Sequence, residues 1–134
     1  MYFSGANTVW DNATTHDWAT SSAGPYTLPW SGGSIADFVS PAGTVTVSGN
    51  IASVNSLSFD VTGYALTGGN INLTGSGGSI AVVAGNAAIG SVLSGSVGLT
   101  KTGSGLLTLS GGLLNISGLS TSSGSAVFNF GGGI

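Results

Sequence analysis

The stretch "GLTKTGSGLLTLSGG", residues 98–112, sets two short runs of alternating apolar residues on either side of a Gly-Ser-Gly turn. Alternation with a period of two predicts β-strands with one face turned inward. Glycine-rich turns separate such runs, and we expect one strand to follow the next at an interval of nine or ten residues. No stretch shows a period of 3.6 residues over the length of a helix. We therefore expect an all-β protein. Its inward-facing pairs are Val45 and Val47, Leu57 and Phe59, Ile71 and Leu73, Ile80 and Val82, Leu107 and Leu109, and Leu114 and Ile116.

The turns distinguish between two all-β architectures. Short strands joined by glycine-rich turns suit either an antiparallel sandwich or a parallel solenoid. The dipeptides Asn-Gly and Asp-Gly, which favour two-residue hairpins, do not occur in this sequence. Gly-Asn and Ser-Gly-Gly punctuation instead favours bends between the successive faces of a coil. The sequence predicts a parallel β-solenoid.

The first 43 residues have a different composition from the rest of the chain. An end coil of a solenoid exposes apolar core and unpaired strand edges, so it needs a bulky cover. We predict that residues 1–43 form an N-terminal cap with the first coils. Residues 44–134 form the solenoid body of the same continuous domain, with regular strands to about Phe130. The N-terminal segment holds all three prolines and Tyr2, Phe3, Trp10, Trp18, Tyr26, Trp30 and Phe38.

Charge is nearly absent from this chain. Of its 134 residues 4% are charged, the net charge is −3, and Lys101 is the only basic residue apart from His16. Neutralising a phosphate backbone takes several Lys or Arg side chains, so we expect no nucleic-acid partner. There is no cysteine to form a disulfide or a thiolate. The first residues lack the pattern of a signal peptide, so we expect a mature segment.

One uncharged window, residues 79–99, has the length of a membrane-spanning helix. Glycine, serine and asparagine interrupt this window every four or five residues, which divides it into pieces of strand length. We therefore expect strands there and no membrane insertion.

Residues 98–111 resemble the autotransporter-associated β-strand repeat, and the stretch from "NTVWDNATTHDWATSS" to "INLTG" is similar to the lead-in of such repeats. The resemblance implies a right-handed β-solenoid passenger segment of a secreted bacterial protein, displayed or released outside the cell. The last stretch, "GLLNISGLSTSSGSAVFNFGGGI", departs from the repeat and includes no translocator barrel, so we expect one segment of a longer protein or a reduced relative of the family. The matching positions are Leu99, Thr100, Lys101, Gly103, Gly105, Leu107, Leu109 and Gly111.

Few residues are candidates for chemistry. His16 with Asp11 and Asp17 has the right ligand types for zinc or proton transfer, but three ligands on one loop fall short of a structural site. Lys101 is expected on a solvated face or beside an Asp. No acid follows Asp60, so no carboxylate pair for glycoside cleavage is available there. We predict no catalytic, cofactor or metal site, and no enzyme; a solenoid lyase or esterase would need its catalytic groups within the first sixty residues.

We expect an extracellular structural protein, a passenger-like or stalk-like solenoid on the bacterial surface, whose neighbours are further solenoid repeats. One alternative is a filament subunit that stacks head to tail through its coil ends. Another is an adhesin that binds surface glycans through Trp10, Trp18, Tyr26 and Trp30, although a packed cap explains these aromatic residues too. The sequons at Asn12, Asn72 and Asn115 are interpreted as turn and ladder residues.

Overall fold

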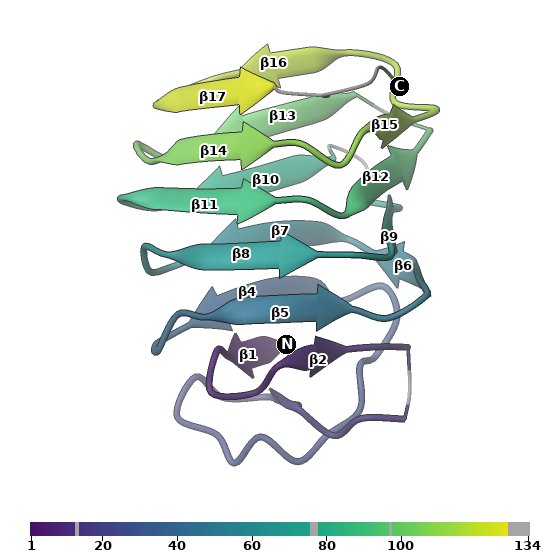
Figure 1. Cartoon of the computed structure of the whole chain (residues 1–134), viewed down its shortest axis with the longest axis vertical. Coiled ribbons are helices and arrows are strands. Elements are labelled where there is room, and N and C mark those ends of the chain that lie inside the picture. Colours follow the sequence, from purple (N-terminus) through teal and green to yellow (C-terminus); the bar gives the residue numbers. More distant parts are fainter. Residues whose placement is uncertain (13, 76–77, 97, 129–134) are drawn as a thin grey trace.

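The chain forms a β-solenoid in the computed structural model, which describes residues 1–12, 14–75, 78–96 and 98–128. Those residues contain strands and turns but no helix, and so no helix that could span a membrane. In Figure 1 the chain runs left to right along the front sheet and right to left behind it, rising with each turn, which is a right-handed coil. About four turns are complete. The predicted right-handed parallel β-solenoid is confirmed.

Three sheets form the walls. Sheet A has the spatial order β16 (Leu119–Thr121), β13 (Leu99–Thr102), β10 (Ser79–Val82), β7 (Ser56–Phe59), β4 (Ile35–Val39), β1 (Tyr2–Ser4) and β3 (Trp18–Ala19). Sheet B has the order β17 (Ser125–Phe128), β14 (Leu106–Leu109), β11 (Asn86–Ile89), β8 (Tyr64–Thr67), β5 (Thr44–Val47) and β2 (Val9–Trp10). Sheet C has the order β15 (Leu113–Leu114), β12 (Val92–Gly95), β9 (Asn70–Leu73) and β6 (Asn50–Val54).

Each complete turn contributes one strand to each sheet. Paired residues on neighbouring turns lie about 20 positions apart: Leu107 pairs with Ala126, 19 residues on, and Leu57 pairs with Ile80, 23 residues on. From β7 to β14 successive strands therefore begin six to nine residues apart. The expected interval of nine or ten residues is wrong, because strands such as β11, "NAAI", lack large alternating side chains and escape a search for apolar pairs.

The core consists of inward side chains stacked in columns from turn to turn. One column in sheet A contains Phe3, Phe38 and Phe59, which are in register on β1, β4 and β7 and are fully buried. The rings of Phe38 and Phe59 stack with centroids 4.9 Å apart. Because each such side chain contributes about 1.5–3 kcal/mol when fully buried, the columns are the main stabilising element of the coil.

An irregular segment, residues 11–12 and 14–34, covers the N-terminal end (Figure 1). Its strand β3 pairs antiparallel with β1, and the Trp18 and Leu28 backbones exchange two hydrogen bonds of 2.9 Å. The rings of Trp10, Trp18 and Trp30 pack with centroids 4.6–5.1 Å apart. This aromatic cluster is the predicted cap. The sheets themselves begin earlier than residue 44, since β1, β2 and β4 already belong to them.

The other end of the described coil is different. Strands β15, β16 and β17 each pair on one side only, within residues 98–128. Leu119, which continues the inward position of Leu99, is 41% exposed. Of the expected inward pair, Ile116 is partly buried against the core, but Leu114 is 55% exposed, because Leu113 and not Leu114 pairs with the buried Leu93. Phe130, the expected end of the strands, lies outside the described residues.

Candidate functional site

The loop of Asp11, His16 and Asp17 is organised by local hydrogen bonds. The Asp11 carboxylate accepts hydrogen bonds from the Thr14 and Thr15 backbone nitrogens at 2.9 and 3.0 Å, and from the Thr14 hydroxyl. Desolvation acts to raise the pKa of Asp11, but these hydrogen bonds outweigh it and lower the pKa. Desolvation and the Asp11 charge raise the pKa of Asp17. Within the described ranges no three His, Asp or Glu side chains gather where a metal could bind.

The N-terminal tryptophans face one another and not the solvent. Trp10 and Trp18 are fully buried and Trp30 is almost so. Tyr26 is partly buried, and its hydroxyl donates a hydrogen bond of 2.6 Å to the Ser22 carbonyl. An indole stacks on a sugar only if one face of the ring is open. The three tryptophans therefore form the packed cap and offer no sugar platform.

Lys101 lies inside the coil, so the prediction of a solvated lysine is wrong. Lys101 is 1% exposed, and in sheet A it pairs with Ile80 on one side and with Thr121 on the other, at an inward-facing position. The ammonium donates hydrogen bonds to the carbonyl oxygens of Gly103, at 2.5 Å, and Ser123, at 3.0 Å. Burial lowers the pKa of Lys101. The alternation that places Leu99 inward also places Lys101 inward, and this signal was present in the sequence.

Polar side chains connect the turns along the outside of sheet C. Asn12 Nδ2 donates to the Asn50 carbonyl at 2.5 Å, and the Ala52 backbone nitrogen donates to Asn12 Oδ1 at 3.1 Å. One turn on, Asn70 Nδ2 donates to Asn50 Oδ1 at 2.5 Å. The bonds bridge residues 20–40 positions apart, so they fix one turn against another.

The ladder continues through the next turn. Asn70 Nδ2 also donates to Ser94 Oγ at 3.0 Å, and Ser94 donates to Asn72 Oδ1 at 3.3 Å. Asn72 Nδ2 donates to the Ala52 carbonyl at 2.9 Å. Asn115 adopts a φ of 59°, a left-handed conformation that Asn tolerates in turns. Asn12, Asn72 and Asn115 thus have the ladder and turn roles predicted for them.

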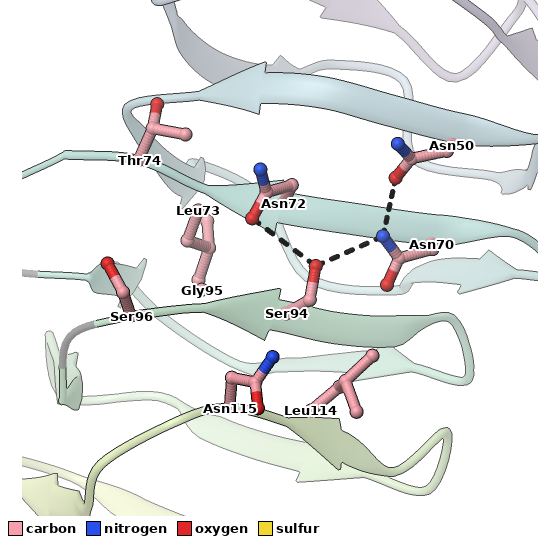
Figure 2. Close-up of a pocket in the computed structure, with 10 residues that line it drawn as sticks. All are labelled: Asn50, Asn70, Asn72, Leu73, Thr74, Ser94, Gly95, Ser96, Leu114 and Asn115. Carbon is pink, nitrogen blue, oxygen red and sulfur yellow. Dashed lines mark hydrogen bonds between the residues drawn. The ribbon is translucent and has the colours of Figure 1, made fainter.

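A groove opens over this ladder, where Ser94 lies between larger side chains of neighbouring turns (Figure 2). Carboxamides and hydroxyls from four successive turns line it, together with the exposed Leu114. No local sequence pattern indicates this groove, because the residues that line it lie on different turns. The residues that line it are Asn50, Asn70, Asn72, Leu73, Thr74, Ser94, Gly95, Ser96, Leu114 and Asn115.

The resemblance of residues 98–111 to the autotransporter-associated repeat rests on the sequence pattern alone. In the structure this stretch forms β13, a glycine corner and β14, which are parts of one turn of the solenoid. Comparison of the chain with protein-family models, with curated proteins and with solved structures finds no match.

Proposed function

We propose that this chain is an extracellular structural protein, a passenger-like or stalk-like β-solenoid segment of a secreted or surface-displayed bacterial protein. The observation that carries the proposal is how the chain uses its polar side chains. The Asn12–Asn50–Asn70–Ser94 ladder and the Lys101–Ser123 bond each join one turn to another. Such bonds keep neighbouring turns in register, and a rigid rod needs turns that do not slide against one another.

The two ends of the coil suit a rod that extends in one direction. Residues 11–12 and 14–34 close the N-terminal end, and β3 is already paired on both sides, by β1 and by Leu28. At the other end, β15, β16 and β17 have one paired side each among the described residues. Each added turn would lengthen the rod by about 4.8 Å, the spacing of neighbouring strands.

The extracellular location is supported by the repeat resemblance and by a surface wetted by hydroxyls and amides. An antibody against the purified chain tests it in cells that carry the gene. We expect labelling of intact cells, or of the culture medium, and loss of surface labelling after brief protease treatment of those cells. Labelling that appears only after cell lysis would contradict the location and leave the structural role to be judged by the stability experiments below.

A filament subunit is the second candidate, favoured by the one-sided pairing of β15–β17 and by three exposed apolar residues there, Leu114, Leu119 and Val127. In a head-to-tail filament this edge would meet the cap of the next copy. Because β3 of the cap is already paired, the contact would depend on apolar packing more than on new strand pairing.

A further inference from the structure

The groove outside sheet C presents groups that both donate and accept hydrogen bonds. Asn50, Thr74, Ser96 and Asn115 are exposed along it, and Asn72 is half-buried. A carboxamide offers one acceptor oxygen and two donor protons, and a hydroxyl offers both functions. The groove therefore matches a ligand whose groups also both donate and accept.

The side chains of Asn115 and Leu114 are available to a ligand in the groove. The Asn115 side chain makes no hydrogen bond within the described part of the chain, although its left-handed backbone holds it on the rim beside Leu114 (Figure 2). Leu114 exposes 55% of its surface there. Asn70 Oδ1 also lacks a hydrogen-bond partner among the described residues, but this oxygen is buried beneath the groove.

The groove carries no charge. None of the residues that line it is ionisable, and the only lysine, Lys101, is buried with its ammonium on backbone carbonyls. An anion or a cation entering the groove would lose hydration without gaining a counter-charge. The ligand that fits is neutral.

The pairing of the strands beneath the groove disfavours a peptide as its ligand. Strands β9 and β12, which run beneath the groove, are paired on both sides, by β6 and β12 and by β9 and β15 respectively. A peptide lying over these two strands would find no open strand edge to extend, which is the usual source of affinity in strand addition. The unpaired side of β15 lies at the C-terminal end of the described coil and not over β9 and β12. Sugar hydroxyls need no such edge, since side-chain amides and hydroxyls bind them directly.

We propose that this groove binds a neutral saccharide that lies along the solenoid axis, with hydroxyls on Asn50, Asn72 and Asn115 and an apolar sugar face on Leu114. From the turn of Asn50 to that of Leu114 the groove covers three strand spacings, roughly 14 Å, which accommodates a short oligosaccharide. The site differs from the buried tryptophans of the cap and does not depend on the proposed location of the chain.

Titration of the ¹⁵N-labelled chain with the neutral sugars cellotriose, maltotriose and N,N′,N″-triacetylchitotriose, followed by NMR, tests the proposal. We expect at least one of them to give saturable shifts of the Asn50, Asn72 and Asn115 side-chain amides at millimolar concentrations. Asn115→Gly keeps the left-handed backbone but removes the carboxamide, and should weaken binding roughly five-fold, the effect of one lost hydrogen bond. Leu114→Ser should weaken it as well.

Asn86→Ser, at an exposed Asn of sheet B outside the groove, is the matched control and should bind like the wild type. Unchanged backbone spectra away from each substitution verify that the variants fold. Three results would overturn the proposal: no saturable shift with any of the three sugars, equal affinity in Asn115→Gly and wild type, or stronger shifts of the groove amides with an uncharged, end-blocked tetra-alanine peptide.

Discussion

Lys101 Nζ donates a hydrogen bond of 3.0 Å to the carbonyl oxygen of Ser123, 22 residues further along the chain and one turn further along the solenoid. The same ammonium binds the Gly103 carbonyl of its own turn. The lysine therefore joins two turns from inside the coil. The Ser123 hydroxyl also donates a hydrogen bond of 3.2 Å to the Gly103 carbonyl, so Lys101 and Ser123 together link the two turns at this corner.

Replacement of Lys101 should destabilise the coil. We expect Lys101→Ala to lower the free energy of unfolding by about 2–4 kcal/mol, since it leaves a cavity and removes the side-chain donor of the Ser123 carbonyl and one of the two side-chain donors of the Gly103 carbonyl. Lys101→Met keeps most of the volume and should cost less. Urea unfolding followed by tryptophan fluorescence measures both. An alanine variant as stable as the wild type would contradict the structural role of this lysine.

Tyr64 should make stability depend on pH in the alkaline range. Its buried hydroxyl donates to the Val39 carbonyl, and burial raises the pKa of Tyr64 to about 12. Between pH 10 and 12 the unfolded tyrosine loses its proton while the folded one keeps it, so wild-type stability falls as pH rises through this window.

Tyr64→Phe isolates this effect, because every other ionisable group is the same in both proteins. We expect the variant to be about 1–3 kcal/mol less stable than the wild type at pH 8, owing to the lost hydrogen bond. The difference should shrink as pH rises from 10 to 12. Urea unfolding at several pH values measures it; a constant difference across that range would show that Tyr64 ionises normally.

A comparison of Gly49 and Gly103 distinguishes the cost of a left-handed backbone from the cost of a steric clash between turns. Gly103 and Gly49 both have positive φ, 80° and 75°, but a Cβ on Gly103 would lie 2.2 Å from the Val82 carbonyl oxygen, whereas one on Gly49 would meet nothing within 4 Å. Gly49→Ala should cost about 1–2 kcal/mol from the left-handed backbone alone. Gly103→Ala should cost clearly more or prevent folding. Equal melting temperatures for the two variants would contradict the close approach of the turns.

The open edge should make the chain associate. Strands with one unpaired side and exposed apolar residues pair with other chains, and an almost uncharged surface opposes this only weakly. We expect light scattering to show a mass that grows with concentration, and Val127→Lys on β17 to lower it, because lysine blocks edge pairing. Fibres in electron micrographs would support the filament candidate, whereas a monomer at every concentration would exclude it.

Periodicity predicted the strands and missed their positions around the coil. The alternation at Leu57, Phe59, Ile80 and Val82 is local, and each of these side chains is buried as expected. Leu113 and Leu114 are adjacent apolar residues, so either could face inward, and the pairing of Leu113 with Leu93 makes Leu113 the inward residue. Leu114 is therefore exposed at the groove, which no local sequence pattern predicts.

Local sequence patterns are enough to specify a β-solenoid: alternating apolar residues require strands, glycine-rich corners permit tight bends, and an aromatic first segment covers one end. The contacts between turns, such as the hydrogen bonds of Asn70 with Asn50 and of Lys101 with Ser123, are defined only by the folded coil. The physical reason is that contacts between turns depend on the summed length of three strands and three corners. One residue more or less in any corner shifts every pairing, while the local patterns stay the same.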